Sequence, residues 1–200
     1  MNSRSSRALS LVASLALFLT GCQSAKLDSY VDANYSAKQI KRVVVLPMSN
    51  TTLSAGQANE LSRSFAQSLQ RKNPSLVIIG AGEAVQKIND ANLADDWAKH
   101  LMNFASSGIP NTKIVERVGE LLEVDAVIQG TMLAVSQQDS NGYNYPITRV
   151  SLRYTMLSTK DVRILWELTG EGVKQPYAYT ASPIIDAVRI AHEKIISSIP

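Results

Sequence analysis

The chain has 200 residues, of which 45% are hydrophobic and 18% are charged, and its formal net charge is +3. This length is enough for one domain with a sizeable core. Two of the cations, Arg4 and Arg7, stand at the very start, so the rest of the chain is nearly neutral and lacks the basic surface of a nucleic-acid-binding protein. The single cysteine, Cys22, excludes an intramolecular disulfide.

Residues 1–21 have the parts of a secretory signal. Arg4 and Arg7 precede an apolar run of 12 residues, 8–19, which small residues close. A membrane-spanning helix needs about 17–25 residues, so this run is too short to span a bilayer. A cleaved secretory signal of the ordinary kind is the other alternative, but it would leave an unpaired thiol in an exported protein.

The end of this signal, Leu19-Thr20-Gly21-Cys22, resembles the lipobox of bacterial lipoproteins. The resemblance implies cleavage between Gly21 and Cys22, a diacylglycerol on the thiol and an acyl chain such as palmitate on the new amine. Two or more such chains make a stable membrane anchor. In this class an aspartate after the cysteine retains the protein in the inner membrane, so Gln23 predicts the periplasmic face of the outer membrane in a Gram-negative source. Beyond this lipid we expect no cofactor and no metal.

Residues 22–38 are small and polar and have no hydrophobic period, so we predict a lipidated N-terminus followed by a flexible tether. A flexible chain of this length spans about 20–25 Å on average. We expect a periplasmic domain over residues 39–200.

The domain is predicted to contain five strands and five helices. A continuous β-branched run such as Val43-Val44-Val45 is typical of a strand buried on both faces. Apolar residues at three- and four-residue steps predict helices, and strict alternation predicts strands with one wet face. In chain order we expect a strand at 41–47, a helix at 57–71, a strand at 76–79, a helix at 80–89, two helices within 92–123, strands at 124–135, 150–156 and 164–168, and a helix at 183–199.

The predicted order is β-α-β-α-α-α-β-β-β-α. Early strands separated by helices need crossover connections, whereas the last three strands can form a meander. We therefore predict an α/β (α+β) fold with a single mixed sheet and helices packed on it.

Three segments resemble the CsgG-like lipoproteins: the strand and loop at 41–50, the sequence LLEVDAVIQGT at 121–131 and the sequence LSTKDVRILWE at 157–167. The group includes the curli-secretion channel lipoprotein and the lipoproteins that activate penicillin-binding proteins. The resemblance implies a fold like the N-terminal domain of TolB. Two departures separate this chain from those relatives. Its 137–146 loop is too short for the membrane hairpins of the channel, and its predicted tether is short for reaching a synthase at the inner membrane.

Catalytic candidates are few. Asp96 and His100 stand four apart on a predicted helix, as a catalytic relay or a metal site would require, but a surface position for both is the plainer interpretation. His192 is predicted on a helix surface. Gly80 and Gly82 follow a strand as in a dinucleotide-binding loop, but Val85 stands where the third glycine belongs.

Two predicted loops carry exposed aromatic residues that suit partner binding: Tyr143 and Tyr145 in one, Tyr177 and Tyr179 in the other. Packing of these tyrosines on their own domain is the alternative. Arg149 and Arg153 share the outer face of their strand, which is either solvated or meets an anionic partner.

We therefore expect a lipid-anchored protein of the outer membrane, not an enzyme, whose domain binds an envelope protein or a cell-wall component. The expected role is that of an accessory factor in envelope biogenesis or secretion. Two alternatives stay open: an oligomeric component of a CsgG-like secretion system, for which a homo-oligomer is needed, and a cell-wall-associated enzyme that uses Asp96 and His100.

Overall fold

A computed structural model of the chain describes residues 23–50, 52–140, 145–175 and 180–200. Its elements, in chain order, are β1 (Gln23–Val31), a 3-10 turn η1 (Ala37–Gln39), β2 (Arg42–Val45), α1 (Ala55–Lys72), β3 (Val77–Ile79), α2 (Ala81–Asp90), α3 (Ala94–Ser107), α4 (Thr112–Leu122), β4 (Ala126–Gln138), β5 (Ile147–Ser158), β6 (Ile164–Lys174) and α5 (Ile184–Ser197). The predicted fold class, a mixed sheet with helices packed on it, is confirmed.

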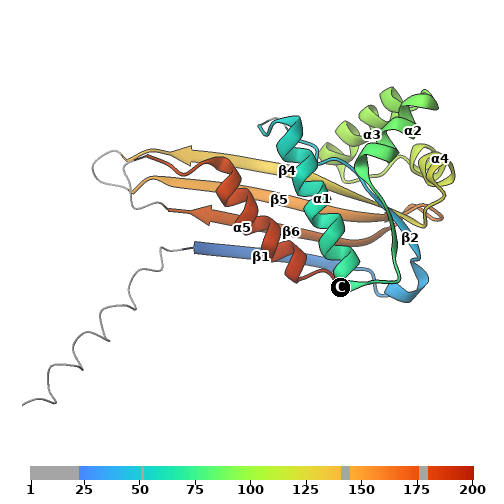
Figure 1. The fold of residues 1–200 in the computed structure, drawn as a ribbon, viewed down its shortest axis with the longest axis horizontal. Helices are drawn as coiled ribbons and strands as arrows, with labels where there is room; N and C mark the ends of the chain where they lie inside the picture. The colour runs from blue at the N-terminus through green and yellow to red at the C-terminus, as the bar shows by residue number, and fades with distance from the viewer. Residues whose placement is uncertain (1–22, 51, 141–144, 176–179) are drawn as a thin grey trace, which may run out of the picture.

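All six strands form one sheet in the order β1-β6-β5-β4-β2-β3. The short strand β2 runs parallel to both β3 and β4, and the long strands β4, β5, β6 and β1 pair antiparallel. As the unbroken run of valines predicts, Val43 and Val44 are fully buried on opposite faces of the sheet. The long antiparallel strands extend well beyond the parallel part and give the molecule its elongated shape (Figure 1).

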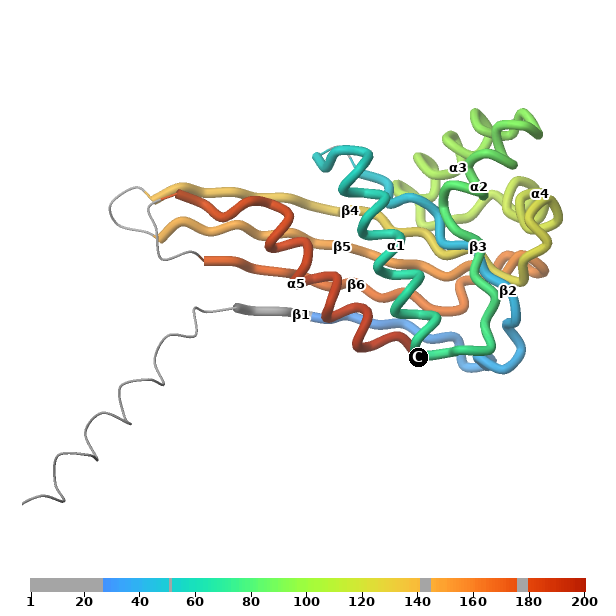
Figure 2. Tube along the Cα trace, viewed as in Figure 1, coloured from blue at the N-terminus to red at the C-terminus, as the bar shows by residue number. Residues whose placement is uncertain are grey.

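Helices cover the two faces of the sheet unequally. On one face, α1 and α5 lie side by side across the strands (Figure 2) and bury Phe65, Tyr154, Trp166 and Ile195 in the larger core. On the other face, α2, α3 and α4 pack only on the parallel part, where Trp97, Val118 and Leu157 belong to a second core. The antiparallel part therefore keeps one face without a helix among the described residues.

Polar side chains occupy this uncovered face. The guanidinium of Arg153 lies 3.6 Å from Glu167 Oε1, and the hydroxyl of Thr155 donates to Glu167 Oε2 at 3.0 Å. Arg149 pairs in the same way with Glu171 on the neighbouring strand. These cross-strand pairs neutralise the arginines within the sheet, so the structure favours the solvated interpretation of this face.

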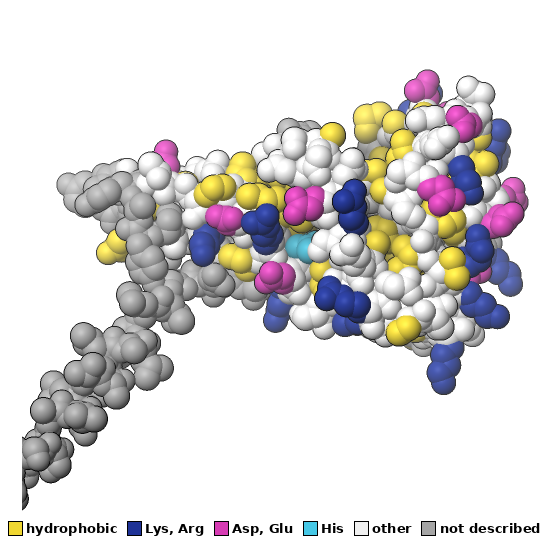
Figure 3. Space-filling view, viewed as in Figure 1, with side chains coloured by type: hydrophobic (Ala, Val, Ile, Leu, Met, Phe, Trp, Pro, Cys, Tyr) yellow, Lys and Arg dark blue, Asp and Glu magenta, His cyan; other side chains and the backbone are white. Residues whose placement is uncertain are grey.

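Helix α5 lies unusually close to β6 because the strand carries two glycines beneath it. A Cβ at Gly172 would overlap the carbonyl oxygen of Ala187, and one at Gly170 would stand 2.7 Å from Ile195. Only glycine leaves room for the helix backbone at this distance. Figure 3 shows charged side chains of both signs over this α1 and α5 face, and Arg189 joins the two helices through Glu60 at 4.0 Å.

Strand β1 is the main departure from the predicted architecture. We predict a flexible tether over 22–38, but Gln23–Val31 pairs antiparallel with β6, with Leu27 opposite Gly170 and Val31 opposite Trp166. The tether prediction is therefore wrong for the residues of β1. The strand forms because β6 offers an open edge of backbone donors and acceptors, and Leu27 packs on the larger core. The folded part of the chain thus begins sixteen residues earlier than the predicted boundary at 39.

Candidate functional site

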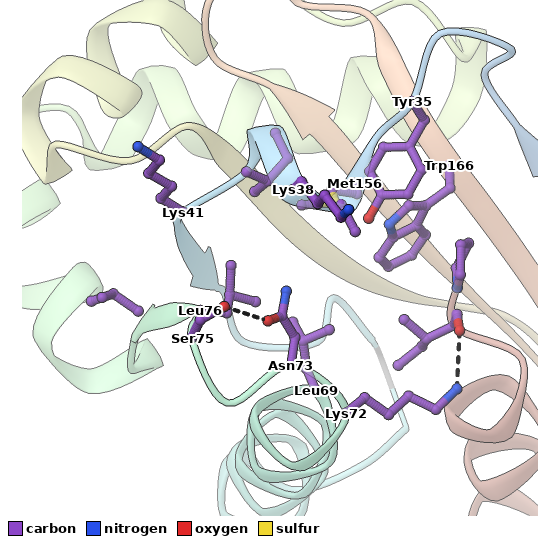
Figure 4. A pocket seen from close by; sticks show the side chains of 15 residues that line it. Tyr35, Lys38, Lys41, Leu69, Lys72, Asn73, Ser75, Leu76, Met156 and Trp166 are labelled. Atoms are coloured by element: carbon purple, nitrogen blue, oxygen red, sulfur yellow. Dashed lines mark hydrogen bonds between the residues drawn. The ribbon is translucent and has the colours of Figure 1, made fainter.

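A cavity lies at the end of the sheet where β1 finishes. It has a volume of about 660 Å³, which is in the usual range for small-molecule and peptide pockets. Its rim comes from the segment between β1 and β2, the end of α1 with the turn that follows it, and the end of α5, and its inner wall includes residues of β5 and β6 (Figure 4). We call this cavity the β1-end pocket; its lining residues are Tyr35, Ala37, Lys38, Ile40, Lys41, Leu69, Lys72, Asn73, Ser75, Leu76, Val77, Met156, Trp166, Ile199 and Pro200.

The inner wall of this pocket consists of apolar side chains that are packed in the core. Met156 of β5 and Trp166 of β6 are opposite one another in the sheet, and both are almost fully buried. Leu69 comes from the last turn of α1 and Leu76 from the strand entry after it, and both are buried in the larger core. These side chains give the cavity an apolar inner wall.

Tyr35 closes one side of the pocket over Trp166 (Figure 4). A tight turn fixes its position, since the backbone N–H of Tyr35 donates to the carbonyl of Asp32 at 2.9 Å. Asp32 is itself held by Arg163, whose Nη1 lies 3.1 Å from Oδ1. Partial burial raises the pKa of Tyr35, and a hydrogen bond from the Trp166 indole opposes that rise. The phenol is therefore neutral at ordinary pH and can still accept or donate a hydrogen bond.

Three lysines line the same pocket. Lys72 donates to the carbonyl oxygens of Ser197 at 3.1 Å and Ile199 at 3.0 Å, and so neutralises the negative end of α5. In Figure 4, Lys38 lies near Tyr35 and Met156, whereas Lys41 extends away from them. Among the described lining residues none is Asp or Glu. An apolar wall beside ammonium groups is suited to binding a partner group that is apolar at one end and anionic at the other.

The structure does not bring the predicted Asp96 and His100 pair together as a catalytic unit. His100 is only 1% exposed; its ring packs on Trp97 and Phe104, and its Nδ1 accepts a hydrogen bond from the backbone N–H of Asn111 at 3.2 Å. Asp96 instead lies near Lys99 in solvent, at 3.9 Å. The prediction of a surface position is wrong for His100, because α3 turns that side chain toward α4. Desolvation lowers the pKa of His100 to about 4.

The surface prediction for His192 is also wrong. This side chain of α5 is 4% exposed and its Nδ1 lies 3.1 Å from the hydroxyl of Tyr154, with the ring of Phe65 6.0 Å away. Burial lowers the pKa of His192 to about 4, so the ring is neutral at ordinary pH. His192 belongs to the core under α1 and α5 and His100 to the core under α2–α4, so the sheet separates the two histidines.

The structure gives no packing reason for glycine at positions 80 and 82. Gly80 is the N-cap of α2 with an ordinary φ of −75°, and a Cβ at either glycine would meet nothing within 4 Å. Neither glycine is therefore required by close packing of helix on strand, one of the roles of glycine in such a fingerprint. These glycines line a second cavity of about 460 Å³ with Pro47 and Arg63, between the ends of β2 and β3.

Of the four predicted contact tyrosines only Tyr145 lies in the described part of the chain, where it is 76% exposed. Tyr143, Tyr177 and Tyr179 lie outside the described residues, as do Gly21 and Cys22. The described residues hold no group of three or more metal-ligating side chains. Among the helices of the same residues, none has the length and apolar character needed to cross a bilayer.

Sequence reasoning misses the β1-end pocket, since its residues are dispersed from position 35 to position 200. Nothing in the local pattern marks Tyr35 or Lys38 as neighbours of Trp166. The one available signal is the position of Trp166 in a strand that alternates apolar and polar residues, which predicts burial but not a cavity.

No protein-family model matches the sequence, and neither does any curated protein. Among solved structures, the lipoprotein GNA1162 from Neisseria meningitidis is similar at 15% identity and a TM-score of 0.50, covering 79% of this chain and 99% of that one. A PelC dodecamer from Paraburkholderia phytofirmans matches at 12% identity, a TM-score of 0.43 and coverage of 87% and 96%. The LpoB C-terminal domain from Escherichia coli matches at 13% identity, a TM-score of 0.38 and coverage of 72% and 90%.

These likenesses concern the fold. The first establishes that a bacterial lipoprotein has an architecture like that of this chain, and the other two are too distant to add to it. The resemblance to the CsgG-like group and to TolB stays a prediction.

Proposed function

We propose that this chain is an outer-membrane lipoprotein, anchored through lipid on Cys22, whose domain binds another component of the envelope without catalysing a reaction. The observation that carries the proposal is the position of the lipobox relative to the fold. Cys22 immediately precedes β1, so the anchor belongs to one end of the sheet, while the β1-end pocket lies at the other end of the same strand. A membrane attachment and a binding site at opposite ends suit an accessory protein that presents its site to the periplasm.

The likeness of the fold to a lipoprotein of Neisseria meningitidis supports the first half of the proposal. The pocket supports the second half, because its inner wall of Met156, Trp166 and Leu76 is apolar and Lys38 near that wall can meet an anionic group. The role that we propose for the chain is in envelope biogenesis or secretion, which fits the compartment to which the predicted signal would direct it. The enzymatic alternative built on Asp96 and His100 has no support from their geometry, since the histidine is buried and the carboxylate points to solvent.

A photo-crosslinking amino acid in place of Lys38, at the rim of the pocket, tests the proposal in intact cells. Lys113 is the matched control, because it is also an exposed lysine but lies on α4. We expect one specific crosslinked protein or wall fragment from position 38 and none from position 113. In a Cys22→Ser variant, we expect that the protein no longer sediments with the outer membrane and that the crosslinked product from position 38 is lost. Equal products from both positions, or a Cys22→Ser variant that stays in the membrane fraction, would contradict the proposal.

A further inference from the structure

Four strands have neighbouring ends at the end of the sheet that is remote from the pocket. Gln23 of β1 lies opposite Lys174 of β6, Lys174 lies opposite Thr148 of β5, and Thr148 lies opposite Gln137 of β4. Figures 1 and 2 show the beginning of α5 at this same end. Tyr145 precedes β5 and therefore stands beyond this row, and it is 76% exposed. We call Gln138, Tyr145, Ile147 and Lys174 the distal edge.

The distal edge is joined to Cys22 with almost no intervening chain. Consecutive Cα atoms are about 3.8 Å apart, and Gln23 is already paired with Lys174. Even if pairing with β6 is counted only from Leu27, the five peptide units between Cys22 and Leu27 reach no further than about 18 Å. A lipid on Cys22 would therefore hold this edge at the bilayer, with none of the freedom of a long tether.

We propose that the distal edge rests on the lipid surface in which Cys22 is anchored, with Tyr145 in the headgroup layer. The proposal depends on the proposed lipidation. The side chain of Tyr145 has an apolar ring and a polar hydroxyl, the combination that is enriched at membrane interfaces. Lys174, for which no ion pair is seen among the described residues, can meet lipid phosphates.

The other charges at this edge do not oppose such contact strongly. Arg149 is paired with Glu171, and the carboxylate of Asp139 accepts a hydrogen bond from the backbone N–H of Ala181 at 3.0 Å. The local charge is thus close to balanced, so the lipid rather than electrostatic attraction holds the edge in place. The residues between Gln23 and Val31 then lead away from the membrane, and at about 3.3 Å per residue they place the β1-end pocket about 25 Å from it.

A fluorophore that reports membrane depth tests this orientation. In the lipidated full chain Cys22 has no free thiol, so a Tyr145→Cys variant can be labelled at one position with nitrobenzoxadiazole. Tyr30→Cys is the matched control, because Tyr30 is also exposed, at 52%, but lies in β1 seven residues after Gln23 and so away from the distal edge. Both variants are reconstituted in phosphatidylethanolamine and phosphatidylglycerol vesicles that contain nitroxide-labelled lipids.

We expect blue-shifted emission and several-fold stronger nitroxide quenching at position 145 than at position 30. A flexible linker of about 20 residues between Gln23 and Ser24, which spans about 25 Å on average, should abolish that difference while the protein stays on the vesicles. Equal, water-like emission from both positions in vesicle-bound protein would overturn the orientation and leave the anchor intact. Failure of the unlabelled protein to bind vesicles at all would instead contradict the proposed lipoprotein function.

Discussion

At the scale of single residues, the two buried histidines link the stability of the domain to pH. Burial lowers the pKa of both His100 and His192 from 6.5 to about 4. At a pH between these two pKa values the unfolded chain binds more protons than the folded chain, so protonation favours unfolding. The contribution of the two neutral histidines to the free energy of unfolding is complete above pH 6.5 and is lost as the pH falls toward 4.

For His192 this loss amounts to about 3 kcal/mol at most, from the size of the pKa change. A His192→Phe variant lacks this titration, although it also removes the partner of the Tyr154 hydroxyl and so lowers the stability at every pH. We therefore expect a smaller difference between its unfolding free energies at neutral pH and at about pH 5 than in the unaltered protein. Urea denaturation at both pH values measures it, and an unchanged difference would contradict the assignment.

Asp125 shows what the family-like sequence LLEVDAVIQGT does in the fold. Its Oδ2 accepts hydrogen bonds from the backbone N–H groups of Lys41 at 2.8 Å and Arg42 at 2.9 Å, which fixes the entry of β2 beside β4. In the same segment, a Cβ at Gly130 would stand 2.9 Å from the ring of Tyr154. These residues have structural roles, which is why the sequence predicts the fold much better than the function.

An Asp125→Ala substitution should lower the free energy of unfolding by about 1–2 kcal/mol, since two backbone donors lose a charged acceptor. Glu120→Ala on the exposed side of α4 is the control, and we expect it to stay within about 0.5 kcal/mol of the unaltered protein. Urea denaturation of both variants measures the difference. Equal effects would show that the Asp125 hydrogen bonds do not stabilise the strand entry.

At the scale of elements, the contact between α5 and β6 depends on a strand glycine. A Gly172→Ala substitution places a methyl group against the backbone of Ala187, which cannot move without shifting the whole helix. We expect a loss of about 3 kcal/mol or more in the free energy of unfolding. Gly82→Ala in α2 is the control: its Cβ meets nothing within 4 Å, so we expect no loss and a gain of up to about 1 kcal/mol from helix propensity. Thermal and urea unfolding measure the stability of both variants. A Gly172→Ala protein as stable as the Gly82→Ala protein would refute the close packing of α5 on β6.

The elements with a strong hydrophobic period are those that sequence predicts well. Phe65 and Leu69 on α1 stand four residues apart, Val188 and Ile195 on α5 stand seven apart, and all four are buried on one face of their helix. Strand β1 carries many small and polar residues, so no hydrophobic period identifies it. This edge strand is ordered by its hydrogen bonds to β6, a partner more than 130 residues away that the local sequence of β1 does not reveal. The surface prediction for His192 is wrong because the ring of Phe65 reaches it only through tertiary contact. The surface prediction for His100 is wrong although its signal is local, since Trp97 and Phe104 stand three and four residues away on the same helix and pack on its ring.

At the scale of the whole molecule, strand β1 joins the proposed anchor to the candidate pocket. Because β1 is part of the sheet, the proposed lipid would be attached to the sheet itself, and the length of the sheet, not a flexible tether, would set the reach of the domain. If the anchor lies in the outer membrane as proposed, the pocket can meet envelope components within the length of the domain from that membrane. Components near the inner membrane must then extend toward the pocket.

The account depends centrally on the chemistry of the mature N-terminus. Mass spectrometry of the protein purified from membranes measures it directly. We predict a mature chain that begins at Cys22 and carries diacylglycerol on the thiol and an acyl chain on the amine, and a Cys22→Ser chain without these masses. A mature chain that begins at another residue, or one that begins at Cys22 with a free thiol, would contradict the anchor and with it the proposed orientation of the domain.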